Sequence, residues 1–322
     1  MRMYVDRGRQ YSIAGFLAAL LVVLALAAGN FFSLGNFSDI LVNISFVTIA
    51  AVGMMAVILT GQIDISIGVT LSICSTVAAI ASKAGVPIPL VVLISVGTGA
   101  LLGLVNGLLV TRFKVHSIIV TLGTMSVFRG LLIYFTKGAW IYSLPQDFRS
   151  VGLGTFLGIQ NPIWAMIIVL LVAAWLFSST AWGRSLYAVG SNPEAARLSG
   201  IRVPFVQASV FVVLGALVGL ATMFYATRFS TIQSNTGQGF EFVVITAVVV
   251  GGVNIFGGSG TVLGVALGAL LVGITGTALT FLGISAYWEQ AIQGLFILLA
   301  VAFDSVRLRR RRYVLQKVRG GV

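Results

Sequence analysis

The chain is built from successive apolar stretches of about 20 residues, separated by short polar turns. A helix rises about 1.5 Å per residue and the hydrocarbon core of a bilayer is about 30 Å thick, so one such stretch can cross the bilayer as a helix. Hydrophobic residues make up 58% of the 322 residues and charged residues only 9%, whereas a soluble domain carries about a quarter charged residues. The sequence therefore predicts an all-α, polytopic integral membrane protein.

Apolar length, judged against bilayer thickness, predicts about ten spans. The first span follows basic residues, as the core of a signal peptide would, but the many later spans favour a helix that is kept in the chain. We expect a basic cytoplasmic N-terminus at 1–10, a single transmembrane domain over 11–303 and a basic cytoplasmic tail at 304–322. The predicted spans are 11–31, 41–60, 65–82, 88–110, 118–136, 162–180, 205–226, 242–257, 261–282 and 287–303.

The formal net charge is +12, and half of the Lys and Arg residues lie near the two ends of the chain. Basic residues favour the cytoplasmic side of a membrane, and an even number of spans returns the chain to its starting side. We therefore expect both termini and the polar connection 181–204 in the cytoplasm. The connection 137–161 is expected outside, where it could support a short interfacial helix. Because no RNA-binding motif accompanies the basic tail, its expected partner is membrane lipid and not nucleic acid.

Motifs for catalysis are missing from the sequence. There is no G-x-x-x-x-G-K-[ST] loop, so the chain cannot bind ATP in the usual phosphate cradle. One cysteine, Cys74, and one histidine, His116, cannot build a conventional zinc site, and the hydrolase motif G-x-S-x-G does not occur. We expect no catalytic residue, no metal and no cofactor bound by this chain.

Four polar residues are candidates for a translocation path or for a structural role: Asp64, Thr121, Arg129 and Asn254. Burying a polar group in lipid is costly unless it faces protein or a water-filled path. Arg129 lies inside a predicted span. The alternative to a place in the translocation path is a structural ion pair, or a side chain that snorkels to the membrane interface. Asp64 follows a break in the apolar run, so we expect its carboxylate to cap the next helix by accepting backbone N–H groups. Proton-coupled carriers show several acidic or histidine residues within spans, which makes a proton relay the weaker interpretation.

The connection 181–204 carries the signals of a short capped helix. Asn192 suits an N-cap, and Pro193 suits the first helical turn. Glu194 complements the positive end of the helix dipole, and Gly200 suits a C-terminal stop. The alternative is a solvated amphipathic connector without a partner.

Two segments of the first half resemble the permease subunits of ribose-type ATP-binding-cassette sugar importers. Residues 60–68 read TGQIDISIG and look like that family's TGGIDLSVG, with Gln62 in place of glycine. Residues 120–130, which begin VTLGTM and end in Arg-Gly, are similar to the family's fifth-span signature. His116 departs from the proline often found just before it.

Two segments of the second half resemble the same family. Residues 180–201 are similar to its cytoplasmic coupling segment, and residues 237–260 contain runs similar to its G-x-G-x-E-L and G-G-x-S-x-x-G-G-x-G. The external loops, with Trp140 and Asn235, look closest to the rhamnose and autoinducer-2 importers. Each motif is short, but the four occur in order over most of the chain between 60 and 304.

The resemblance implies a ten-helix permease of the bacterial inner membrane that translocates a monosaccharide such as rhamnose, ribose or an autoinducer-2-like molecule. It implies a second permease copy or a paralogue, a cytoplasmic subunit that binds ATP, and a periplasmic sugar-binding protein. The ATPase-coupling residues would be Asn192, Glu194, Ala195, Arg197 and Gly200. Two alternatives stay open: a branched-chain amino-acid-type permease, and a self-sufficient secondary carrier.

Overall fold

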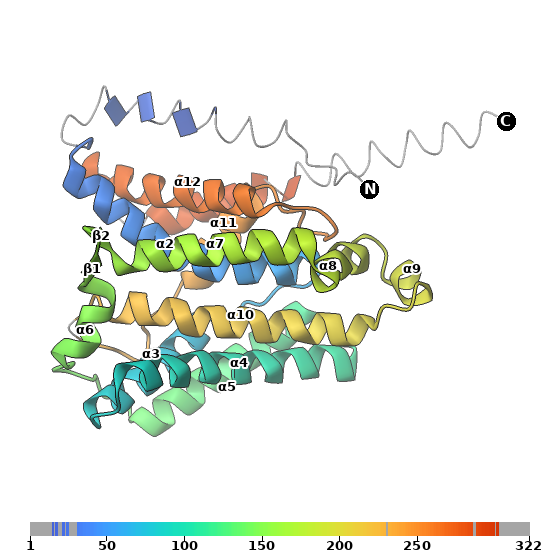
Figure 1. Ribbon diagram of the computed structural model, residues 1–322, viewed down its shortest axis with the longest axis horizontal. Helices are drawn as coiled ribbons and strands as arrows, with labels where there is room; N and C mark the ends of the chain where they lie inside the picture. The colour runs from blue at the N-terminus through green and yellow to red at the C-terminus, as the bar shows by residue number, and fades with distance from the viewer. Residues whose placement is uncertain are drawn as a thin grey trace.

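The structure is a computed structural model that describes residues 15, 17–18, 21–22, 24–25, 31–229, 231–285, 288–299 and 301–302. Its long helices run lengthwise beside one another, with short elements at both ends (Figure 1). The helices are α2 (Leu34–Leu59), α3 (Ile67–Lys83), α4 (Ile88–Phe113), α5 (Ser117–Thr136), α6 (Gln146–Leu153), α7 (Asn161–Ser179), α8 (Ala181–Ser191), α9 (Pro193–Leu198), α10 (Val203–Ala226), α11 (Phe240–Val250) and α12 (Val262–Phe281). Strands β1 (Thr155–Phe156) and β2 (Ile159–Gln160) form a small antiparallel hairpin.

Within the described ranges, six helices are long and apolar enough to cross a membrane: α2, α4, α5, α7, α10 and α12. The prediction of an all-α, multi-pass membrane protein is thereby confirmed. Two further apolar helices are shorter, with 17 residues in α3 and 11 in α11. At 1.5 Å per residue they extend about 26 Å and about 17 Å, which is less than the bilayer core of about 30 Å.

The prediction of one continuous span over 242–257 is wrong. α11 ends at Val250, and Gly251 and Gly252 follow it, the latter with a φ of 93°. A residue in the left-handed region cannot continue a right-handed helix, so the chain enters a loop here. Thr261 ends this loop as the N-cap of α12, where its side chain accepts a hydrogen bond from the N–H of Gly264.

The ends of the chain are described only in part. The predicted basic segments 1–10 and 304–322 lie outside the described residues, as does most of the predicted span 11–31. Residues 288–299, within the predicted last span, are helical. α2 starts at Leu34, well before the predicted residue 41, because the Ser33 hydroxyl caps it by accepting the N–H of Asn36 at 3.2 Å.

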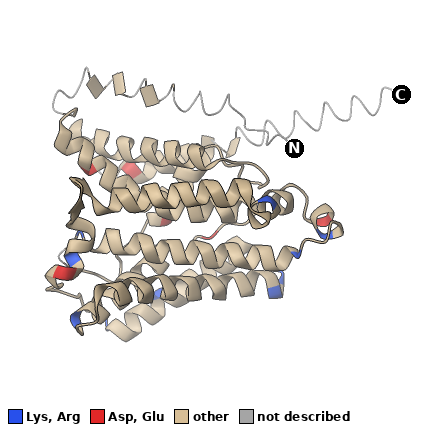
Figure 2. Ribbon diagram, in the orientation of Figure 1, with Lys and Arg blue, Asp and Glu red and all other residues tan. Residues whose placement is uncertain are grey.

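The bundle has two distinct ends. Helix α6 and the β hairpin lie at one end, called here the α6 end, and helices α8 and α9 lie at the other, called the α8–α9 end (Figure 1). Charged residues gather at these two ends, while the long helices between them are almost free of charge (Figure 2). The short helix α6 confirms that the connection 137–161 supports one.

Helix α2 forms the centre of the bundle, since 89% of the residues in its most apolar 18-residue stretch are buried. It contacts α7, α10, α11 and α12. Around it, helices pack closely through glycine stripes: a Cβ at Gly99 would overlap the carbonyl of Gly215 in α10, and one at Gly103 would overlap that of Phe211. Small residues let two helix backbones approach closely, so these glycines pack α4 against α10 within one chain.

Candidate functional site

The two short helices, α3 and α11, begin next to each other. Gly68 in the first turn of α3 lies so close to the carbonyl of Gly237 and the carboxylate of Glu241 that a Cβ there would overlap both. From this point α3 runs to the α6 end, where the Nζ of Lys83 donates to the carbonyl of Tyr142 at 2.9 Å. α11 runs the opposite way. The positive ends of both helix dipoles therefore meet inside the bundle, an arrangement that borders substrate sites in many transporters.

The non-helical segment 60–66, which precedes α3, is held along the start of α5. The N–H of Ile63 donates to the hydroxyl of Ser117 at 3.0 Å, and that of Ile65 donates to Thr121 Oγ1 at 3.2 Å. Both hydroxyl residues are fully buried. Non-helical backbone inside a membrane protein needs such partners, because lipid offers none. Ser117 was missed by sequence reasoning; its signal is the four-residue spacing from Thr121, which places both on one helix face.

Asp64 lies at the centre of a buried polar cluster. Its Oδ1 accepts hydrogen bonds from the N–H of Ser66 at 2.8 Å and from the hydroxyl of Ser66 at 2.6 Å. The Nδ2 of Asn106, in the second half of α4, donates to Asp64 Oδ2 at 3.1 Å. The carboxylate thus accepts a backbone N–H as predicted, but that of the N-cap residue Ser66 and not one inside the helix. Asn106 was missed, although a polar residue within an apolar span marks it.

Arg129 joins α5 to two other segments. Its Nη1 donates to the hydroxyl of Ser72 in α3 at 3.3 Å and to the carbonyl of Ser234 in the segment before α11. Its positive charge also interacts with the Glu241 carboxylate at the start of α11. The guanidinium therefore contacts protein groups on the α6 side of the point where the two short helices begin.

Asn254 occupies a different place. Its Oδ1 accepts the N–H of Phe256 at 3.0 Å, and its own N–H donates to the carbonyl of Ser259 at 2.9 Å. These bonds shape the loop between α11 and α12 at the α8–α9 end. The structure therefore brings Asp64 and Thr121 close together, because Thr121 of α5 holds the segment 60–66 that contains Asp64. Arg129 lies further along α5, and Asn254 lies in a separate loop.

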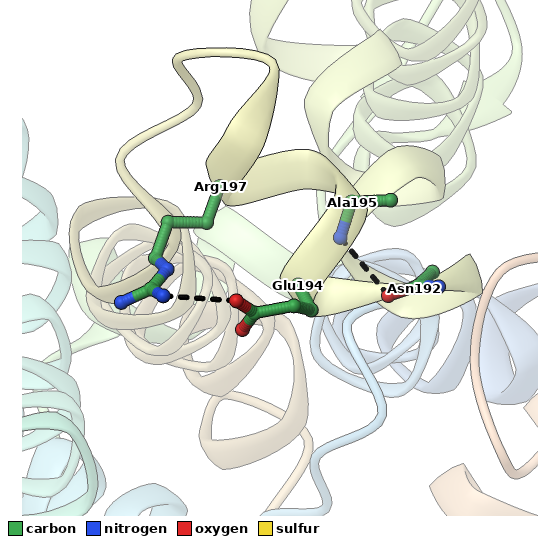
Figure 3. Close-up of polar contacts among 4 residues, drawn as sticks. All are labelled: Asn192, Glu194, Ala195 and Arg197. Atoms are coloured by element: carbon green, nitrogen blue, oxygen red, sulfur yellow. Dashed lines mark hydrogen bonds and ion pairs between the residues drawn. The ribbon is translucent and has the colours of Figure 1, made fainter.

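The predicted coupling segment forms two short helices, α8 and α9. Asn192 is the N-cap of α9, and its Oδ1 accepts the N–H of Ala195 at 3.0 Å (Figure 3). Pro193 follows as the first helical residue. Arg197 and Glu194 form an ion pair of 2.9 Å with both side chains about two-thirds exposed (68% and 67%), so the pair adds at most about 1 kcal/mol.

The C-terminus of α9 is a Schellman motif. Gly200 has a φ of +83°. Its N–H donates to the carbonyl of Arg197 at 3.0 Å, and the N–H of Ile201 donates to the carbonyl of Ala196 at 3.1 Å. The helix stop predicted at Gly200 is confirmed. Leu198, the last helical residue, is 80% exposed. Sequence reasoning missed this residue, although a leucine at the end of a polar connection is its signal.

A set of backbone contacts fastens α8 to the rest of the bundle. Gly190 lies against the carbonyl of Leu59, at the end of α2, and against the backbone nitrogen of Gly258. The N–H of Gly258 donates to the same Leu59 carbonyl at 2.9 Å. Gly257 packs on the backbone of Gly190 and Leu59. We call these four residues, Leu59, Gly190, Gly257 and Gly258, the glycine junction.

Tyr187 adds a second attachment between α8 and the same loop. Its hydroxyl donates to the carbonyl of Gly260 at 3.2 Å. Burial raises the pKa of Tyr187 to about 12, so the hydroxyl keeps its proton at neutral pH. The segment that carries α9 is therefore linked to the loop after α11 and, through Leu59, to the segment before α3.

Known proteins resemble this chain over nearly its whole length. The autoinducer 2 import system permease protein LsrC of Yersinia pseudotuberculosis serotype O:1b (strain IP 31758) is 33% identical over 309 residues, which cover 96% of this chain and 88% of that protein. The LsrC protein of Salmonella typhi is 32% identical over 320 residues, covering 97% and 92%. The resemblance to permeases of ribose-type importers is thereby confirmed. Residues 36–301 match the family described as branched-chain amino acid transport system / permease component, and the chain belongs to this family.

Proposed function

We propose that this chain is the permease subunit of an ATP-binding-cassette importer that carries a small sugar-like molecule across the bacterial inner membrane. Its family consists of transport permeases, and its relatives are named for the import of autoinducer 2. The chain itself has a transport role and is not an enzyme. ATP would be bound and hydrolysed by a separate cytoplasmic subunit, since this sequence has no phosphate-binding loop. This chain would bind no cofactor.

The proposed topology has ten spans, with both termini and the α8–α9 end in the cytoplasm. Five basic residues support this orientation, because they belong to the connections at that end: Arg112, Lys114, Arg184, Arg197 and Arg202. The α6 end would then face the periplasm and receive substrate from a binding protein. A second copy of the chain, or a paralogue, would complete the membrane part of the importer.

The glycine junction supports a coupling role for α8 and α9. A force on the exposed helix α9 passes through α8 to Gly190, and from there to the Leu59 carbonyl and Gly258. Leu59 precedes the segment 60–66 that leads into α3, and Gly258 lies in the loop that follows α11. Because the backbones touch without intervening side chains, α8 can move very little without also moving Leu59 and Gly258. Movement of the ATPase would therefore reach both short helices.

The exposed, double-capped helix α9 is the observation that carries this proposal. Two substitutions test it. Ala195→Arg adds bulk and charge on an exposed position, and Gly200→Val strains the positive φ of the helix stop. Both should abolish ATP-driven uptake and co-purification with the ATPase subunit, while the permease still inserts. Gly85→Val is the matched control. Gly85 has a φ of +80°, and a Cβ there would meet no described atom within 4 Å, but it lies between α3 and α4 at the α6 end.

Normal uptake by well-expressed Ala195→Arg and Gly200→Val variants would show that the ATPase docks at another site on the permease. The connection between α4 and α5, around Arg112 and Lys114, is the next candidate. If Gly85→Val removed ATPase binding to the same degree, the effect would reflect general strain and not docking.

The description of the matched family favours a second candidate, a permease for branched-chain amino acids. Uptake of labelled ribose, rhamnose and leucine by the reconstituted complex separates the two functions. Uptake of leucine alone would support the amino-acid permease. Accumulation of any substrate on a proton gradient, without the ATPase subunit, would instead support a self-sufficient carrier.

A further inference from the structure

A cavity of about 620 Å³ lies between α5 and the segment that leads into α11. Arg129 and Ser126 of α5 form one wall, and Gln233, Asn235 and Gln238 form another. Trp140, in the connection after α5, and Glu241, in the first turn of α11, also line the cavity. A cavity of this size holds a small molecule, since ligand pockets typically measure about 300–1,000 Å³.

The walls present hydrogen-bonding groups that the protein itself does not use. In the described part of the chain, Arg129 bonds protein acceptors through Nη1 alone, which leaves Nε and Nη2 available at the cavity. The carboxamides of Gln233, Asn235 and Gln238 likewise have no partner among the described residues. Each carboxamide offers one acceptor and two donor hydrogens. Polar groups gathered in this way inside a membrane protein point to a hydrated, polar ligand.

The charges in the cavity balance each other. The Glu241 carboxylate lies in the first turn of α11, at the positive end of the helix dipole. It also faces the positive charge of Arg129. Neither charged group is therefore left to neutralise a charge on a ligand. An uncharged ligand fits this balance better than an amino acid, whose ammonium and carboxylate groups would compete with the existing partners.

The indole of Trp140 supplies an apolar face beside these polar groups. Its side chain is 50% exposed, and its ring lies 5.9 Å from that of Tyr142 at an interplanar angle of 35°. An aromatic face next to several donors and acceptors suits a molecule with C–H groups on one side and hydroxyls around its edge. Monosaccharides and other small cyclic polyols have this character.

We propose that the cavity between α5 and the segment 233–241 binds an uncharged polyhydroxylated molecule, with Arg129 and the three carboxamides on its hydroxyls and Trp140 on its apolar face. This inference rests on the proposed import function and assigns the substrate a place on the permease. The cavity lies on the α6 side of the point where α3 and α11 begin, so it would be filled before substrate passes the two short helices.

The test uses protection from thiol labelling in the full-length permease, assembled with its partners in lipid nanodiscs. In a Cys74→Ser background, a single thiol is introduced at Ser126, which is exposed in this cavity and is not one of the proposed ligand-binding groups. The control thiol is at Gln290, which is exposed in a neighbouring cavity of about 830 Å³ between α2 and α12. Ribose, rhamnose and leucine are added separately as probes, each at saturating concentration.

At least one of the two sugars should slow labelling at position 126 and leave labelling at 290 unchanged. Leucine should protect neither position. Trp140→Ala should abolish the protection, whereas Trp175→Ala, which removes an exposed indole from α7, should preserve it. Arg129→Lys keeps the charge but loses the planar fork of donors, so it should weaken protection without removing the positive charge beside Glu241.

Protection by leucine and by neither sugar would overturn the proposal in favour of a zwitterionic ligand. Protection at 290 alone would place the substrate in the other cavity. If neither position is protected while the same complex imports sugar, the site is wrong and the import function stands. If the complex imports no sugar at all, the proposed function fails independently of the site.

Discussion

Gly190 in α8 lies so close to the carbonyl group of Leu59 that a Cβ atom at position 190 would overlap it and the backbone nitrogen of Gly258. Helices α2 and α8 and the loop after α11 meet at this point. The contact explains why a small residue is needed at position 190, and it leads to the first prediction.

Gly190→Ala should destabilise the permease and weaken coupling. Since the obstructing atoms belong to the backbone, the junction must open to admit a methyl group, at a cost of about 1–3 kcal/mol. The expected result is a lower apparent melting temperature in detergent and reduced ATP-driven uptake. Gly97→Ala is the control, because a Cβ at that position of α4 meets no described atom within 4 Å. Equal behaviour of the two variants would contradict a tight junction.

Leu198→Ala should reduce binding of the ATPase subunit without changing the stability of the permease. The side chain is 80% exposed on a short helix of a polar connection, so its truncation removes almost no internal contact. We expect a change in stability within about 0.5 kcal/mol. Co-purification and uptake measure the loss of docking. Leu34→Ala is the control, since Leu34 is 91% exposed at the start of α2. Unchanged co-purification would show that Leu198 does not contribute to binding of the ATPase subunit.

The double variant Ser117→Ala, Thr121→Val should destabilise the segment 60–66. Each substitution leaves one partly buried backbone N–H, of Ile63 or Ile65, without its acceptor. An unsatisfied buried donor costs about 1–3 kcal/mol. Thermal unfolding in detergent measures the effect.

Two further variants control this experiment. The single variant Thr121→Ser keeps the hydroxyl and should therefore keep most of the stability of the unsubstituted protein. Ser178→Ala removes an exposed hydroxyl of α7 that, among the described residues, bonds only its own helix, and it should be neutral. A double variant as stable as Ser178→Ala would show that the two hydroxyls do not hold the segment.

Asp64→Asn should fold and transport, whereas Asp64→Ala should do neither well. The asparagine oxygen can still accept from Ser66, and its amide can donate to Asn106 Oδ1, a buried atom without a partner among the described residues. Alanine would leave these groups unpaired. Expression, melting temperature and uptake distinguish the variants. Loss of uptake in a well-folded Asp64→Asn variant would indicate that the charge itself is needed, as a proton relay requires.

An engineered thiol at Asp147 should react with an impermeant reagent in intact cells, and one at Glu194 should react only after lysis. Both are placed in a Cys74→Ser background. The expectation follows from the bias of basic residues towards the cytoplasm. Asp147 belongs to α6 and Glu194 to α9, so the two thiols report on opposite ends of the bundle. In intact cells, labelling at position 194 with none at position 147 would show that the topology is the opposite of the one proposed.

Local signals in the sequence determined much of this protein. Apolar length predicted the multi-pass α-helical class, because the bilayer thickness imposes it on each span separately. Asn192, Pro193 and Gly200 predicted both ends of α9, since capping depends on residues only a few positions apart.

The tertiary structure decided the relationships between distant segments. Hydropathy extended the span at 242–257 through Gly252, because an average over a window does not register one left-handed residue. No local pattern indicates that α3 and α11 begin at one point, that Ser117 holds the backbone at Ile63, or that Gly190 fits on the Leu59 carbonyl. Such contacts join residues far apart in the chain, and only the packing of whole helices, which buries apolar surface and satisfies each backbone group, brings them together.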